Sequence, residues 1–227
     1  MENAIFGGSF LLRAPGRIFA PEQFTAEHRE IARATEEFFF QEVEPNLEAI
    51  LHQDFAALRR VLEKSAEAGL VATLIPEQYG GLEMDLASAM IVTEGVARDA
   101  SYASCHGGQA GIGALPVSWF GTEEQKQRYL TKLVTAELVG AYCLTEPQAG
   151  SDALACRTRA DLSADGKHYI LNGTKQWITN AAWADVGVVF AKVDGDKFTG
   201  FIVERNTPGF SIGNEEHKLG LRGSSTC

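Results

Sequence analysis

The chain has 227 residues, enough for one large domain or two modest ones. With 45% hydrophobic and 22% charged residues, the composition excludes wholesale disorder and collagen-like repeats. The formal net charge of −10 is unfavourable for contact with a nucleic-acid backbone, and no apolar run approaches the roughly 20 residues of a membrane span. We therefore expect no nucleic-acid partner and no transmembrane segment.

The first part of the chain reads as a leader followed by helices. Residues 1–24 contain two prolines and no sustained hydrophobic period, which predicts an extended leader. Four later positions have the residue types that cap helices, each followed by apolar residues at three- and four-residue spacing: Thr25, Asp54, Asp85 and Thr122. We expect the first helix to end at Pro45 and the second to stop before Gly69.

The middle of this helical part is less regular. The third helix, after Asp85, is expected to carry the apolar residues Leu86, Met90, Val96 and Ala97. The glycine-rich stretch 107–113 resembles a dinucleotide-binding fingerprint, but it follows a helical pattern and lacks a preceding strand. Close helix packing and a short helix near Leu115 explain it better. The last helix begins with a capping box, TEEQ.

At Gly140 the hydrophobic period changes from helix to strand. Short alternating runs follow: AYCLTE, CRTRADL, KHYILNG, TKQWITN, VGVVFAKV, FTGFIVE and FSIG. Turn pairs separate many of them, namely Asp165-Gly166, Asn172-Gly173, Asp194-Gly195 and Pro208-Gly209. The pattern predicts an α+β protein, with a helical N-terminal domain at 25–138 and a β-barrel or sandwich-like domain at 139–227.

Several kinds of site are absent from the sequence. The five histidines have no metal-ligand spacing, and there is no P-loop or G-x-S-x-G elbow. The four cysteines lie far apart without a C-x-x-C pair, and no signal peptide is recognisable. We therefore expect no metal site and a reducing, cytoplasmic setting.

Two segments of the β half are unusual. The run from Tyr142 to Asp152 leads a strand into a loop rich in Pro, Gly and Ser, which is suited to hold an anion or a polar ring edge. In the second segment Trp177 and Thr179 are two residues apart on an expected strand, and hence on one face. A ring beside a hydroxyl suits a planar heterocycle. The alternative, a core tryptophan and an ordinary turn, remains open on these residues alone.

The strings AYCLTEPQAGSD and LNGTKQWITNA, with IPEQYGGL, FGTEEQKQRYLTKL and KLGLRGSST, closely resemble the acyl-CoA dehydrogenase family. The resemblance covers about residues 20–227, and GGSFLL together with KHYILNGTKQWITN is most similar to the long-chain and very-long-chain branch. One departure is Gln148, where the family often has glycine. The resemblance implies a third domain, a C-terminal helical bundle, which we expect to lie outside these 227 residues.

The resemblance implies FAD as the cofactor, bound between the β domain and the bundle. The implied cofactor-binding residues are Tyr142, Cys143, Leu144, Thr145, Glu146, Gly150, Ser151, Trp177, Ile178 and Thr179. Ser151 would also contact the substrate, and Trp177 would pack on the flavin. Bases such as Arg157, Arg159, Lys175 and Arg222 could face the CoA, but solvated strand edges are the more ordinary expectation for them.

The implied reaction is α,β-dehydrogenation of a fatty acyl-CoA, with long chains favoured, as in β-oxidation. In the family the catalytic glutamate lies in the bundle, so we expect no catalytic residue in these 227 residues, and Glu146 is expected to be structural. The implied partners are the acyl-CoA substrate, electron-transfer flavoprotein as electron acceptor, and further copies in a homodimer or homotetramer. Two alternatives remain: a flavin monooxygenase or nitroalkane-oxidase-like relative, and a non-catalytic binding module.

Overall fold

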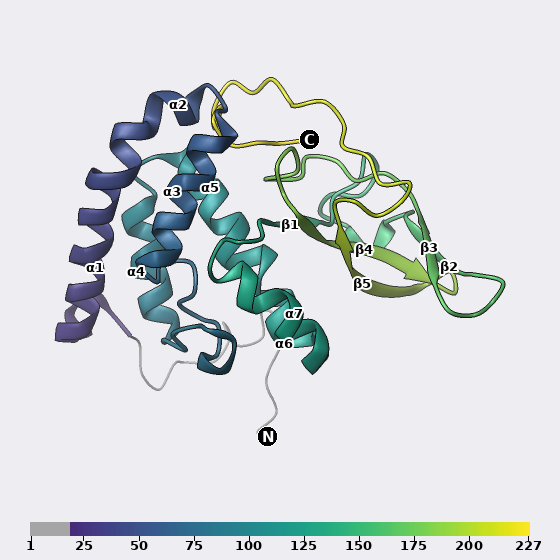
Figure 1. Ribbon diagram of the computed structural model, residues 1–227, viewed down its shortest axis with the longest axis horizontal. Helices are drawn as coiled ribbons and strands as arrows, with labels where there is room; N and C mark the ends of the chain where they lie inside the picture. The colour runs from purple at the N-terminus through teal and green to yellow at the C-terminus, as the bar shows by residue number, and fades with distance from the viewer. Residues whose placement is uncertain (1–18) are drawn as a thin grey trace.

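The computed structural model describes residues 19–227, which form a helical domain followed by a sheet (Figure 1). The helices are α1 (Ala26–Phe38), α2 (Leu47–Leu51), α3 (Phe55–Glu67), α4 (Leu86–Val96), α5 (Ala100–Gly107), α6 (Leu115–Phe120) and α7 (Glu123–Leu133). The strands are β1 (Gly140–Cys143), β2 (Arg159–Leu162), β3 (Tyr169–Asn172), β4 (Val186–Val193) and β5 (Lys197–Glu204). The expected α+β order, helices first and strands second, is confirmed.

All four expected N-caps are present. Thr25, Asp85 and Thr122 each accept a hydrogen bond from the backbone N–H three residues on, and Asp54 accepts from Ala56 and Ala57. A fifth cap, Asp99, begins α5, which the sequence pattern did not predict. Each cap satisfies backbone donors that have no partner within the helix. The helix starts are therefore set by local chemistry.

Other helix expectations were wrong. The chain does not leave helical geometry at Pro45: a π-turn (Phe39–Val43) and a 3-10 turn (Glu44–Asn46) lead directly into α2. Pro45 is tolerated because it lies in the first turn of that 3-10 segment, where its missing N–H is not needed. Leu86 and Met90 are exposed, whereas Val96 is buried together with Ile91 and Val92.

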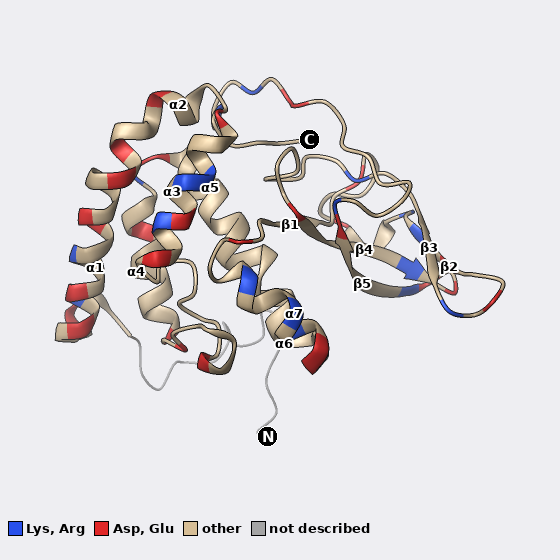
Figure 2. Cartoon of the chain, in the orientation of Figure 1, with Lys and Arg blue, Asp and Glu red and all other residues tan. Residues whose placement is uncertain are grey.

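Of the expected extended leader, residues 1–18, which include GGSFLL, lie outside the described residues, and Pro21–Gln23 form a 3-10 turn. None of the helices within residues 19–227 is both long and apolar enough to cross a membrane. Acidic side chains outnumber basic ones along α1, whereas α3 and α7 each carry several basic side chains (Figure 2).

In the described part of the chain the five strands form one mixed sheet built around β4. β5 pairs antiparallel with β4 along its whole length, so the other edge of β4 holds β1 and β2, both parallel to it. β3 is antiparallel to β2. The Asp165-Gly166 and Asp194-Gly195 turns close the two hairpins, with glycine φ values of 69° and 89°.

Three expectations for the β half were wrong. The run TKQWITN is not a strand, because Trp177 and Asn180 have left-handed backbone conformations, φ 59° and 67°, that interrupt an extended chain. Asn172-Gly173 is not a turn: β3 ends at Asn172, and Gly173 runs on against Thr158. FSIG is irregular as well. Pro208-Gly209 does form a turn, closed by Phe210 N–H to the Thr207 carbonyl at 3.0 Å.

The core is continuous between the helices and the sheet. One cluster joins Leu62 and Tyr102 of the helices to Ile178, Trp183 and Val189. A second cluster joins α6 and α7 to the first half of β4. After β5 the chain returns over the helices (Figure 1), where Gly223 N–H donates to Ser101 Oγ at 3.2 Å. The shared core and the C-terminal segment thus both hold the sheet against the helical domain.

Candidate functional site

The two unusual segments lie side by side, although about 30 residues separate them in the sequence. Gln176 N–H donates to the Thr145 carbonyl at 2.8 Å, and Lys175 Nζ donates to the Leu144 carbonyl at 3.1 Å. The residues directly after β1 therefore contact the segment that carries Trp177. The structure brings Leu144, Thr145 and Glu146 together with residues 175–179, as a shared site requires.

Glu146 is the most strongly bonded carboxylate of this region and is only 3% exposed. Its oxygens accept from Lys175 Nζ at 2.7 Å, Arg157 N at 2.6 Å and Thr158 N at 3.0 Å, and also from Thr158 Oγ1 and Gln148 Nε2. Desolvation by itself would raise the pKa of Glu146, but these hydrogen bonds outweigh it and lower the pKa to about 2. The carboxylate is thus a structural hub of the loop that follows β1.

The surroundings of Lys175 differ from the expectation of a solvated base at a strand edge. Its side chain is 10% exposed and pairs with Glu146, so it is not a solvated base at a strand edge. A lysine can be buried here because the carboxylate and the Leu144 carbonyl satisfy its ammonium group. No spacing rule links positions 146 and 175, since only the folded chain brings them together.

Trp177 is 58% exposed, which rules out the reading of this residue as a core aromatic. The residues that follow Trp177 are held firmly: Ile178 is buried and exchanges two backbone hydrogen bonds with Cys227, at 2.7 and 3.3 Å. Thr179 is half-buried and forms an isolated bridge with Thr226. A large flat ring is therefore exposed on a firmly bonded backbone.

The remaining expected residues differ in their surroundings. Cys143 is buried, and desolvation raises the pKa of its thiol to about 11, so it is an inert packing residue. Burial also raises the pKa of Tyr142. Gly150 and Ser151 are exposed in the loop that follows the tight Glu146–Ala149 turn. The structure thus leaves Ser151 accessible, whereas the Cys143 thiol faces protein.

An apolar cavity of about 500 Å³ opens beside Tyr142, between α6 and the strands β1, β4 and β5. Its lining includes Ile112, Trp119, Phe120, Tyr142, Phe190 and Ile202. The rings of Tyr142 and Phe190 pack edge to face, with their centroids 4.9 Å apart. A cavity of this size and polarity is typical of a small-molecule site. No pattern in the sequence indicated this cavity, because its walls come from elements that are far apart along the chain.

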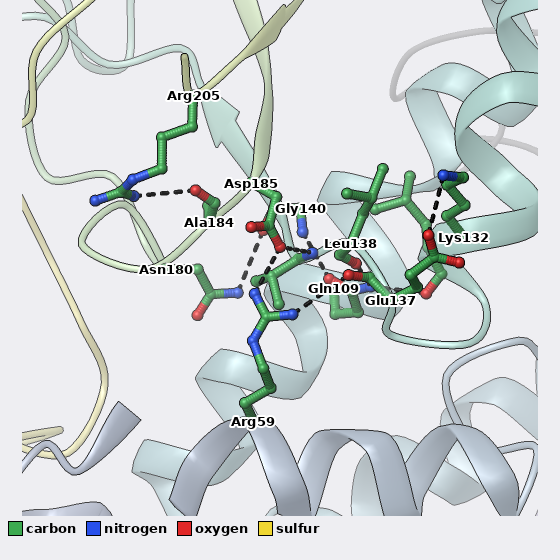
Figure 3. A network of polar contacts seen from close by, with 12 residues as sticks. Arg59, Gln109, Lys132, Glu137, Leu138, Gly140, Asn180, Ala184, Asp185 and Arg205 are labelled. Carbon is green, nitrogen blue, oxygen red and sulfur yellow. Dashed lines mark hydrogen bonds and ion pairs between the residues drawn. The ribbon is translucent and has the colours of Figure 1, made fainter. Parts of the chain in front are cut away.

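A polar network joins the site to the helical domain (Figure 3). Buried Gln109 accepts from Gly140 N–H at 2.7 Å and donates to the Leu133 and Leu138 carbonyls.

Two charged side chains hold the region before β4. Asp185 accepts from Arg59 Nη2 at 2.6 Å and from Val139 N–H at 2.8 Å. Arg205 donates to the carbonyls of Ala181, Ala182 and Ala184. The start of β1 and the turn after Asn180 are therefore fixed from several directions.

The site presents groups that fit a planar, partly polar ligand. An exposed indole ring and the half-buried hydroxyls of Thr145 and Thr179 supply a stacking surface and hydrogen-bonding groups. Within the described residues, no three His, Cys, Asp or Glu side chains are placed to hold a metal ion. The one buried carboxylate of this region, Glu146, is already occupied by protein donors.

Comparisons with known proteins place both halves of the chain. Residues 25–137 match the model of the acyl-CoA dehydrogenase N-terminal domain, and residues 141–227 match that of the acyl-CoA dehydrogenase middle domain. A probable acyl-CoA dehydrogenase of Bacillus subtilis is 49% identical over 97% of this chain and 37% of its own length. The short/branched chain specific acyl-CoA dehydrogenase of Rattus norvegicus is 39% identical over 92% of this chain and 49% of its own length.

Among solved structures, an acyl-CoA dehydrogenase complexed with FAD from Bacillus anthracis superimposes with a TM-score of 0.92. Its sequence is 47% identical, and the match covers 98% of this chain and 39% of that one. The chain therefore spans less than half the length of these three relatives.

Proposed function

The chain belongs to the acyl-CoA dehydrogenase family, of which it carries the N-terminal and middle domains, and from this premise we propose that the protein is an FAD-dependent acyl-CoA dehydrogenase. The observation that carries the proposal is the contact between the segments 142–151 and 175–179, joined by Gln176 N–H and the Thr145 carbonyl. This contact places an exposed indole next to half-buried hydroxyls, which suits an isoalloxazine ring.

In this proposal the two segments hold FAD. Trp177 stacks on the flavin, and Thr145 and Thr179 hydrogen-bond its polar edge. The backbone that holds these side chains in place includes Tyr142, Cys143, Leu144 and Ile178. Ser151, exposed after the turn at Gly150, contacts the cofactor phosphate and the substrate. FAD supplies the acceptor for a hydride equivalent from the β-carbon of the acyl group.

The chain's own residues supply positioning. Glu146 anchors the loop through its bonds to Lys175 and Thr158, and a carboxylate with a pKa of about 2 is a poor acceptor for the α-proton of a thioester. We therefore assign the removal of that proton to a carboxylate outside these two segments. Residues 142–179 contribute no catalytic base in this proposal.

The cavity beside Tyr142 supports a proposal for the substrate class. Its apolar walls, including Trp119, Phe190 and Ile202, suit the hydrocarbon part of an acyl-CoA, and we propose that long chains are preferred. The rat relative is named for short and branched chains, so chain length needs a direct measurement. We also propose electron-transfer flavoprotein as the electron acceptor, a homodimeric or homotetrameric assembly, a cytoplasmic location and a role in β-oxidation.

The decisive experiment is an anaerobic titration of the full-length protein with straight-chain acyl-CoA thioesters from butyryl to palmitoyl. We expect the visible flavin absorption to bleach as the acyl group is oxidised, most efficiently with the longer chains. Bleaching only with short or branched chains would overturn the chain-length proposal alone. A colourless protein, or a flavoprotein that no acyl-CoA bleaches, would overturn the proposed function.

A further inference from the structure

Asn180 directly follows Thr179 and is fully buried at the junction of the two domains. Its Nδ2 donates to the Cys105 carbonyl of α5 at 3.2 Å and approaches the Gly140 carbonyl of β1 at 3.4 Å. The Asn180 carboxamide thus joins the segment that carries Trp177 to the helical domain and to the first strand of the sheet.

The backbone of Asn180 is held as firmly as its side chain. Its N–H donates to the Ser225 carbonyl at 3.2 Å, and its carbonyl accepts from Ala184 N–H at 2.7 Å and Trp183 N–H at 3.1 Å. Its φ of 67° is left-handed, a conformation that asparagine adopts more readily than most side chains. The residue therefore turns the chain and fixes the turn at the same point.

The helical domain leaves room for this contact at Gly108. A Cβ atom there would lie 2.7 Å from Asn180 Nδ2 and 3.3 Å from Thr179 Cγ2. The glycine-rich stretch 107–113 thus has a specific role at Gly108, because any side chain would push the Asn180 carboxamide away from α5.

We propose that Asn180 is a positioning residue for the Trp177–Thr179 segment. Its carboxamide ties that segment to α5 and β1, and this tie holds the exposed indole and the Thr179 hydroxyl in place before a ligand arrives. The inference rests on the proposed function for its effect on FAD, but the ordering of the segment is a property of the chain itself.

The experiment compares Asn180→Gly with wild type in the full-length protein. Glycine keeps the left-handed turn and removes the carboxamide, so the fold is preserved while the tie is lost. Asn172→Ala, at an exposed position in β3, is the matched control. Gly108→Ala is the second variant, because it disturbs the same contact from the other side.

Amide hydrogen exchange gives the first readout. We expect the amides of Ile178 and Asn180 to exchange about tenfold faster in Asn180→Gly and in Gly108→Ala, as the loss of about one hydrogen bond implies. The amides of β4 and α3 should keep their wild-type rates, as should all amides in Asn172→Ala. Unchanged exchange at Ile178 and Asn180, or an equal acceleration across the whole protein, would overturn the proposal.

The bound flavin gives the second readout. We expect Asn180→Gly to weaken FAD binding about tenfold and to shift the visible absorption bands of the bound flavin, because the indole is no longer held in one place. Wild-type affinity together with a wild-type spectrum would overturn the effect on FAD. If the wild-type protein itself binds no FAD, the proposed function fails, while the exchange rates still decide whether Asn180 orders the segment.

Discussion

Arg59 of α3 and Asp185, the residue directly before β4, form an ion pair across the domain junction, with Nη2 and Oδ2 2.6 Å apart (Figure 3). Asp185 Oδ2 also accepts from Val139 N–H, and the Arg59 guanidinium lies 5.9 Å from the centre of the Trp183 ring. The pair therefore joins the helical domain, the start of β1 and the turn that follows the candidate site.

Replacing Asp185 tests this junction. We expect Asp185→Ala to lower the free energy of unfolding by about 2 kcal/mol, because the Val139 N–H loses its acceptor as well as Arg59 its partner. Arg59→Ala should cost about 1 kcal/mol, since the pair is about one-third exposed. Urea unfolding of both single variants and the double variant gives the coupling. A Lys64→Ala control removes an exposed pair with Glu67 and should leave stability unchanged.

The Glu146 carboxylate predicts a pH-dependent stability. Because its pKa is lower in the folded chain than in the unfolded one, its contribution is complete above the unfolded value and is lost as pH falls through the folded value. We expect Glu146→Gln to cost roughly 3 kcal/mol at neutral pH, with the difference from wild type closing between about pH 5 and pH 2. Urea unfolding across that range measures it.

The control for this prediction is Glu137→Gln, at an exposed position, which should differ from wild type by about 0.5 kcal/mol or less. A constant gap between wild type and Glu146→Gln down to pH 2 would show that the carboxylate does not hold the charge on which the bonds to Lys175 and Thr158 depend.

Two glycines of the same stretch predict opposite outcomes. A Cβ at Gly113 would lie 2.5 Å from the Gly108 carbonyl oxygen and 3.2 Å from Gly140 Cα, whereas nothing lies within 4 Å of one at Gly107. Gly113→Ala should therefore destabilise the protein by about 1–3 kcal/mol, because the α6 region can no longer approach β1. Gly107→Ala should be neutral or stabilising by up to about 1 kcal/mol. Thermal unfolding of the pair decides, and equal melting temperatures would refute the close approach.

Substitution of Trp177 should affect ligand binding and stability differently. Its left-handed φ of 59° is unfavourable for tryptophan, and its ring is mostly exposed. Trp177→Gly should therefore keep the wild-type stability or gain about 1 kcal/mol. The same variant should bind FAD up to about tenfold more weakly, since a stacking ring is lost. Trp177→Phe should retain most of the affinity. An unchanged affinity in the glycine variant, measured by flavin fluorescence, would exclude stacking.

Much of the helical part could be predicted because its signals are local. Thr25, Asp54, Asp85 and Thr122 cap helices through backbone groups two or three residues away, so the sequence alone contains both partners. The turns at Gly166 and Gly195 are equally local, because the left-handed φ values that they need favour glycine. The order of helices and strands, and hence the fold class, follows from such signals.

The candidate site could be found in the sequence only as two motifs. The residue types near Tyr142 and Trp177 indicated a planar ligand, and the family resemblance ranked FAD first. The sequence pattern nevertheless made Trp177 and Thr179 neighbours on a strand and Lys175 a solvated base. Both were wrong, because the conformation of 173–180 depends on Thr145, Cys227 and α5 rather than on its own alternation.

The sequence by itself determined where four of the helices begin, the turns at Gly166 and Gly195, and the family to which the chain belongs, because each depends on neighbours within a few residues or on an ordered string. Only the tertiary structure decided that Glu146 is saturated, that Trp177 is exposed, and that Asn180 joins the site to α5. The Glu146–Lys175 and Asn180–Cys105 contacts join residues 29 and 75 positions apart, and only the folded backbone brings such partners into hydrogen-bonding distance.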